Sequence, residues 1–131
     1  MIPPIYLLDT HTLLWFLQGN PRLSPKAKGL VEDQGNRVLV SIVSCWEIAI
    51  KTGQGTMNLS EPSRTLLQRE LPGNDLELLP ISLDHATAVE GLPRHHKDPF
   101  DRLLIAQAMI EGVPIISVDG VFDHYPVRRI W

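Results

Sequence analysis

Four acidic residues, far apart along the chain, have local settings that suit metal chemistry. Asp9 and Asp119 each follow a short apolar run, whereas Glu47 and Asp101 lie near the starts of expected helices. In an open parallel sheet, strand ends and helix N-termini meet at one edge, so all four side chains can reach the same place. Four carboxylates held together repel one another unless a cation lies among them, and oxygen ligands favour Mg²⁺ or Mn²⁺. The sequence therefore predicts a divalent metal site with Asp9, Glu47, Asp101 and Asp119 as its acids.

Magnesium in such a site indicates phosphate chemistry. The ion binds through few carboxylates, keeps several waters and prefers to share its shell with phosphate oxygens. It polarises the phosphate and lowers the pKa of a bound water toward a usable nucleophile. A net charge of -3 and a pI near 5.9 argue against a broad basic surface for nucleic acid. Any contact with phosphate is then local or carried by cations.

Each acid also has a purely structural interpretation. Asp98 precedes a proline and is expected to be the N-cap of the next helix, where Asp101 takes the position of a capping-box acid. Glu47 lies four residues before Lys51, as in an ion pair on a helix surface. Asp119, with the glycine after it, also suits a simple turn. The joint occurrence of the four acids favours the metal site over these separate interpretations.

Several other polar residues rank below the four acids. Asp98 and Asp123 are extra acids, and His11 can relay a proton or make a structural hydrogen bond. His95 and His96 are adjacent, and neighbouring side chains of an extended segment point apart, which disfavours a site for a softer metal. These two histidines are expected to lie either in a solvated loop or on a small basic rim that meets RNA phosphate or an acidic partner. The other members of that rim are Arg94, Lys97 and Arg102.

The elements that must position these residues alternate between strands and helices. Short apolar runs indicate strands at residues 5–8, 38–40, 76–81, 115–118 and 127–130, with Pro80 confining the third to an edge or a strand end. Caps and breakers indicate helices at residues 10–17, 25–34, 42–51, 62–71, 83–90 and 99–111, and a turn or short helix at 121–124. Thr10 or Thr12 is expected to cap the first helix, and Ser41 or Ser44 the third, with Glu47 in its first turn. The alternation predicts an α/β sandwich around a mainly parallel sheet.

Length and composition limit the organisation of the chain. With 131 residues, of which 44% are hydrophobic, the chain suits one domain over residues 1–131. The single cysteine, Cys45, cannot form an internal disulfide, and no apolar run suits a signal peptide or a membrane span. These features predict a soluble cytoplasmic protein.

Four motifs resemble those of the PIN-domain nucleases and, among these, the VapC-type toxins of bacterial toxin–antitoxin pairs. They are LLDTH at 7–11, SCWEI at 44–48, DPFDRLLIAQA at 98–108 and SVDGVF at 117–122. The resemblance covers nearly the whole chain, although the family often has threonine where Ser117 stands. It implies a three-layer α/β/α sandwich and a cytoplasmic endoribonuclease that depends on Mg²⁺ or Mn²⁺. It also implies a homodimer, an RNA substrate, an inhibitory antitoxin partner, and Asp9, Glu47, Asp101 and Asp119 as the acids of the metal site.

Two other functions remain open on the sequence alone. A phosphatase of the haloacid-dehalogenase type uses an aspartate nucleophile like Asp9, but normally has a second acid two residues later, where this chain has His11. That interpretation also leaves Glu47 and Asp101 unexplained. The other alternative is a non-catalytic module that binds RNA or protein, in which the acids serve only as caps.

Overall fold

The computed structural model describes residues 2–131, which form five strands, six α-helices and two short 3-10 helices. The elements are β1 (Ile5–Leu8), α1 (Thr10–Gln18), α2 (Pro25–Glu32), β2 (Arg37–Ser41), α3 (Ile42–Gly53), α4 (Ser63–Gly73), β3 (Leu76–Leu79), α5 (Leu83–Ala88), η1 (Val89–Gly91), α6 (Pro99–Glu111), β4 (Ile115–Ile116), η2 (Gly120–His124) and β5 (Arg129–Ile130). The predicted alternation of strands and helices is confirmed. Over this part of the chain, none of the helices combines the length and the apolar character that crossing a bilayer requires.

All five strands belong to one sheet with the order β3-β2-β1-β4-β5, and every neighbouring pair is parallel. The predicted parallel sheet is thus confirmed, with β3 at an edge as Pro80 requires. Leu8, at the end of the central strand β1, is paired with Val40 in β2 and with Ile116 in β4. The carboxyl ends of these three strands therefore lie level, and the residues that follow them emerge at one edge.

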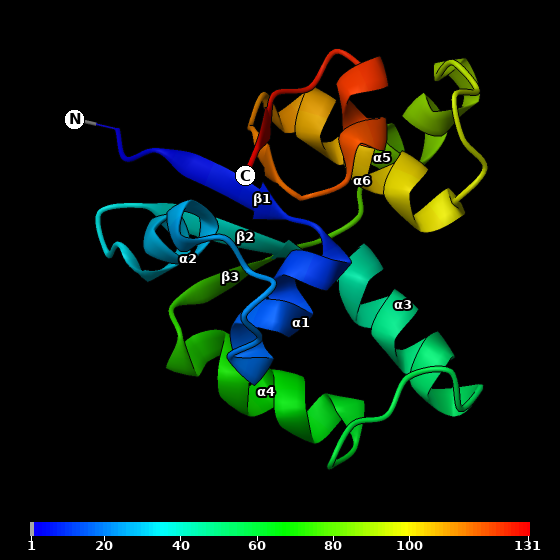
Figure 1. The fold of residues 1–131 in the computed structure, drawn as a ribbon. Coiled ribbons are helices and arrows are strands. Elements are labelled where there is room, and N and C mark those ends of the chain that lie inside the picture. The colour runs from blue at the N-terminus through cyan, green and yellow to red at the C-terminus, as the bar shows by residue number, and fades with distance from the viewer. Residues whose placement is uncertain (1) are drawn as a thin grey trace.

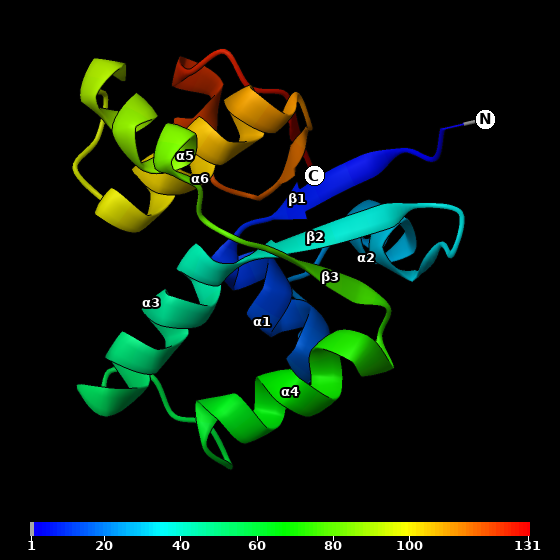
Figure 2. The same ribbon diagram turned by 180° about the vertical axis from the view of Figure 1, so that it is seen from behind.

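Helices cover both faces of the sheet, which makes the predicted three-layer α/β/α sandwich (Figure 1). Helices α1, α2 and α4 lie on one face, and α5 and α6 lie on the other, as the view from behind also shows (Figure 2). Alternate strand residues supply the two apolar layers, since Leu8 packs toward the first set of helices and Leu7 toward the second. Helix α3 reaches both layers, because Ile48 packs in the first apolar cluster and Val43 in the second. This position brings α3 beside the site.

The cap of one helix differs from the prediction, and the cap of another is one of its two predicted candidates. Asp9 is the N-cap of α1, in place of Thr10 or Thr12, and its carboxylate accepts a hydrogen bond from the Thr12 N–H at 2.7 Å. Ser41 caps α3, so the helix begins at Ile42. Glu47 therefore lies in the second turn of α3, and the prediction that it lies in the first turn was wrong.

The last two strands are shorter than predicted. Strand β4 contains only Ile115–Ile116, although the N–H of the next residue, Ser117, still donates to the carbonyl of Ile130 in the neighbouring strand at 3.0 Å. The Oγ of Ser117 accepts a hydrogen bond from the N–H of Asp119 at 3.0 Å, which fixes the loop that follows. Strand β5 contains only Arg129–Ile130. Asp119 consequently lies on a loop three residues beyond β4 and caps η2, whereas the sequence placed it directly at the strand end.

Candidate functional site

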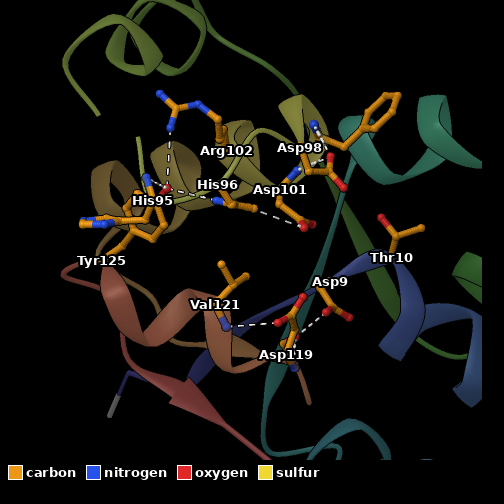
Figure 3. A network of polar contacts seen from close by, with 12 residues as sticks. Asp9, Thr10, His95, His96, Asp98, Asp101, Arg102, Asp119, Val121 and Tyr125 are labelled. Carbon is orange, nitrogen blue, oxygen red and sulfur yellow. Dashed lines mark hydrogen bonds and ion pairs between the residues drawn. The ribbon is translucent and has the colours of Figure 1, made fainter. Parts of the chain in front are cut away.

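Four acidic side chains gather at the carboxyl edge of the sheet, and we call Asp9, Glu47, Asp101 and Asp119 the acid cluster. Asp9 follows the central strand, Asp119 lies on the loop after β4, and Asp101 occupies the first turn of α6. Figure 3 shows these three carboxylates pointing toward one another. The negative charges of Asp9, Glu47 and Asp119 all act on Asp101 strongly enough to raise its pKa. The structure thus places together the four acids that the sequence singled out.

Asp9 is the most deeply buried aspartate of the cluster. Its side chain is 4% exposed, and this burial raises its pKa above the ordinary value. One carboxylate oxygen accepts from Thr12 N–H, and the other accepts from the hydroxyl of Ser117. Each oxygen keeps a lone pair for a further partner. Ser117 also accepts from the Asp119 N–H, so one buried hydroxyl ties the loop that carries Asp119 to Asp9.

Asp101 has the most perturbed carboxyl group of the cluster. Burial in the first turn of α6 raises its pKa, and the negative charges of Asp98, Asp9, Glu47 and Asp119 raise it further, to about 7. The positive end of the helix dipole favours the charged form but does not offset these terms. Near neutral pH, therefore, this carboxyl group holds a proton about half of the time unless a cation compensates the negative charge.

Glu47 makes the ion pair with Lys51 that their spacing suggested, but its own side chain is buried, with 3% exposed, and does not lie on the helix surface. Its Oε2 lies 2.5 Å from the ammonium of Lys51, one helical turn later, and this contact raises the pKa of Lys51. Its Oε1 accepts a hydrogen bond from the Thr10 hydroxyl at 2.6 Å. Thr10 is the residue after Asp9, so the hydroxyl connects α1 with α3 beside the acid cluster. The sequence indicated Thr10 only as a candidate helix cap and not as the partner of Glu47.

Three residues that ranked lower in the sequence lie outside the acid cluster or have structural partners. The Asp98 carboxylate accepts from the N–H groups of Phe100 and Asp101 at 2.9 and 3.3 Å, which confirms its prediction as an N-cap. Asp123 forms an exposed pair with Arg129, with Nη2 and Oδ2 3.0 Å apart. His11 is exposed, and its ring lies 6.0 Å from the ring of Trp15.

The predicted basic rim is only partly present. Arg94 and Lys97 are exposed, but the guanidinium of Arg102 donates to main-chain carbonyls. Its shortest contact joins Nη1 to the carbonyl of Pro93 at 2.8 Å. Arg102 therefore fastens the segment before α6 to the helix, and its expected contribution to a phosphate-binding rim was wrong. Tyr125 accepts a further, longer bond from Arg102 at 3.5 Å, and no local sequence signal indicated this partner.

The chemistry of the acid cluster fits a hard divalent cation. Among residues 2–131, no three His, Cys, Asp or Glu side chains approach closely enough to enclose a metal ion by themselves. Magnesium does not need such an enclosure, because it usually takes one or two carboxylates and completes its shell with waters and phosphate oxygens. The donors here are carboxylate and hydroxyl oxygens, and burial, followed by the negative charge of the neighbouring carboxylates, raises the pKa of Asp101. A cation among these acids would remove that repulsion.

Comparisons with known proteins agree with this fold. The family described as PIN domain matches residues 6–127. Similar solved structures include VapBC2 from Rickettsia felis bound to a promoter DNA fragment, with a TM-score of 0.68, 18% identity and 96% of this chain and 97% of that chain covered. DNA-bound VapBC from Salmonella typhimurium has a TM-score of 0.65 and 20% identity, with 97% of each chain covered. A toxin-antitoxin complex from Klebsiella pneumoniae has a TM-score of 0.65 and 16% identity, with 96% of each chain covered. No curated protein matches the chain.

Proposed function

We propose that this protein, which belongs to the PIN domain family, is a metal-dependent endoribonuclease. It would act as the toxin of a toxin–antitoxin pair. Its reaction would be hydrolysis of RNA phosphodiester bonds by a metal-activated water. The 131 residues would act as one nuclease domain, with both apolar clusters packed on a single sheet. The single cysteine and the RNA substrate suit action in the cytoplasm.

The observation that carries this proposal is the gathering of negative charge around Asp101. Burial and four neighbouring carboxylates raise its pKa to about 7, which is costly for a site without a cation. A purely structural role of Asp101 in the first turn of α6 does not explain this arrangement, because Asp98 already caps the helix. The charge is therefore best explained by a partner that is itself cationic, and the all-oxygen donor set supports Mg²⁺, with Mn²⁺ as the alternative.

The residues of the acid cluster would have distinct tasks. Asp9, Asp101, Asp119 and Glu47 would hold the ion together, one or two of them directly and the others through its bound waters. The ion, when bound, would polarise the scissile phosphate and lower the pKa of a water. Ser117 keeps the Asp9 carboxylate oriented, since its hydroxyl donates to Oδ2. Lys51 balances part of the negative charge of Glu47 through a contact of 2.5 Å.

Cleavage of total cellular RNA tests the proposal. The wild type should cut RNA when Mg²⁺ is present and lose cutting when EDTA removes the ion, whereas Asp101→Asn should lose orders of magnitude in rate, because a neutral amide binds the cation poorly. Asp84→Asn is the matched control, since Asp84 is an exposed acid in the first turn of another helix, α5. The cut ends should be a 3′-hydroxyl and a 5′-phosphate, because the attacking group is water. Unaltered cleavage by Asp101→Asn, or 2′,3′-cyclic ends, would contradict the mechanism.

A protein partner and a homodimer complete the proposal. Large apolar side chains are exposed on the described surface, including Ile42 at 38%, Trp46 at 56% and Leu78 at 51%, and such surfaces favour protein contacts. One similar structure is a toxin-antitoxin complex, which supports a small antitoxin as partner. Co-expression with a short neighbouring reading frame should give a co-purifying complex without ribonuclease activity. Light scattering should give twice the monomer mass for the free protein.

The alternatives have less support. A phosphatase would use Asp9 as nucleophile, yet this residue is 4% exposed and both carboxylate oxygens accept hydrogen bonds from the protein. A binding module without catalysis would not explain why a carboxyl group with a raised pKa lies among other acids at Asp101. It predicts RNA binding that survives Asp101→Asn together with no cleavage by the wild type.

A further inference from the structure

The imidazole ring of His96 lies between a buried tyrosine and the acid cluster (Figure 3). Its Nδ1 is 3.0 Å from the hydroxyl oxygen of Tyr125, and its Nε2 is 3.7 Å from Oδ2 of Asp101. Within residues 2–131, Nε2 is one of two buried side-chain polar atoms without a hydrogen-bond partner. A buried polar atom without a hydrogen-bond partner is destabilising, because it has lost its hydrogen bonds to water and gained none from the protein. The proton state of this ring therefore determines what Nε2 can offer to Asp101.

The surroundings of the Tyr125 hydroxyl determine where the proton of His96 lies. Tyr125 is 4% exposed, and its oxygen receives the N–H of His95 at 3.2 Å and Nη1 of Arg102 at 3.5 Å. A hydroxyl oxygen has two lone pairs and one hydrogen, and both of these neighbours can only donate. The two lone pairs are then occupied, and the acceptor left for the hydroxyl hydrogen is Nδ1 of His96. Because Nδ1 accepts, the ring proton is on Nε2, facing Asp101.

The groups behind this arrangement are held firmly. Arg102 is fixed by the carbonyl of Pro93 at 2.8 Å, and Tyr125 packs edge-on against the rings of His95 and His96 at 5.1 and 5.6 Å. The main chain of His95 and the side chain of Arg102 thus both keep the tyrosine oxygen in place. The tautomer of His96 is set by the fold rather than by exchange with solvent.

We propose that His96 is a positioning residue. The Tyr125 hydroxyl selects its Nε2–H tautomer, and a small approach from the present 3.7 Å lets Nε2–H donate to Oδ2 of Asp101 and leaves Oδ1 to the cation. This inference rests on the proposed function, because it assigns His96 a task only if Asp101 holds a metal ion. Carboxylates that bind metals are commonly oriented by such a donor, and losing it typically weakens metal binding about 10- to 100-fold. From the sequence, this histidine was expected in a solvated loop or on a basic rim, and no orienting role was assigned to it.

Nitrogen chemical shifts of the metal-free protein test the tautomer directly. In the wild type, Nδ1 of His96 should resonate as an unprotonated nitrogen and Nε2 as a protonated one. Tyr125→Phe keeps the ring but removes the hydroxyl, so His96 should change toward a mixture of tautomers. A wild-type spectrum with the proton on Nδ1 would overturn the proposal, and so would an unchanged tautomer in Tyr125→Phe.

Calorimetric titration with Mg²⁺ tests the consequence for Asp101. His96→Ala should weaken binding about tenfold, whereas His96→Gln should retain most of the affinity, because its amide N–H₂ can replace the donor at Nε2. His124→Ala is the control, since the exposed His124 stacks on the ring of His95, with 5.5 Å between the centroids, but takes no part in the hydrogen bonds at the Tyr125 hydroxyl. Circular dichroism establishes that each variant is folded. Equal affinity of folded His96→Ala and wild type would overturn the proposal.

The two proposals fail in different ways. If the wild type binds Mg²⁺ and cleaves RNA, but His96→Ala does so equally well, the positioning role falls and the nuclease stands. If the wild type neither binds Mg²⁺ nor cleaves RNA, the proposed function falls and takes the positioning role with it. The tautomer measurement needs no metal, so it reports on the Tyr125–His96 arrangement in either case.

Discussion

Replacing Asp101 by asparagine should make the metal-free protein more stable, although it removes a proposed catalytic acid. The pKa of Asp101 rises from 3.8 to about 7 in the folded state, and each unit corresponds to about 1.4 kcal/mol. The whole shift would amount to about 4 kcal/mol. The side chain is 21% exposed, so solvent screening reduces this figure, and we expect a gain on the order of 2 kcal/mol.

The sign of the effect depends on pH. The folded state binds the Asp101 proton more tightly than the unfolded chain, so it carries the extra proton between about pH 4 and pH 7. The free energy of unfolding of the metal-free wild type therefore falls as the pH rises through that window. The asparagine side chain has no charge to bury, so the variant should gain its full advantage at about pH 8 and lose it near about pH 4.

Urea unfolding followed by circular dichroism in EDTA measures this difference. Asp84→Asn is the control, because this acid also lies in a first helical turn but is exposed, and its change should stay within about 0.5 kcal/mol. Added Mg²⁺ should reverse the order, since an ion at about a hundred times its dissociation constant stabilises the wild type by about 2.7 kcal/mol. A metal-free Asp101→Asn protein that is less stable than the wild type at about pH 8 would refute the reasoning.

Two further substitutions test the supports of the acid cluster. Lys51→Met leaves the buried Glu47 without its 2.5 Å partner, and urea unfolding should show a loss on the order of 3 kcal/mol; a neutral result would mean that Lys51 does not support the buried glutamate. Ser117→Ala removes the hydroxyl that donates to Asp9, so calorimetry should show Mg²⁺ binding about tenfold weaker, and unchanged binding would exclude Ser117 as an orienting group.

Local signals predicted most of the fold. Asp98 and the proline after it marked the start of α6, and the chain caps the helix there. Short apolar runs located the strands because both faces of a parallel sheet are buried. One cap was predicted wrongly and another was left between two candidates, because nearby residues compete for the same position. Asp9 was a better cap for α1 than Thr10 or Thr12, and Ser41 rather than Ser44 set the start of α3.

The acid cluster was predictable as a set, but its supports were not. Strand ends and helix starts have positions that topology determines, so four distant acids could be assigned to one edge. The partners of these acids depend on side-chain packing between elements that are far apart in sequence. Thr10 and Glu47 are 37 residues apart, and His96 and Tyr125 are 29 apart, with nothing in either local sequence to indicate the pairing.

Two adjacent residues at the start of α6 contact different parts of the molecule. Asp101 faces the acid cluster, whereas Arg102 holds the carbonyls of the preceding segment, since neighbouring side chains diverge around a helix. The first turn of α6 therefore joins the chemistry and the surrounding loop in one cooperative unit of local unfolding. Fraying of this turn would release the loop and move the Asp101 carboxylate away from the other acids at the same time. Amide hydrogen exchange in this turn would therefore measure how often the acid cluster comes apart.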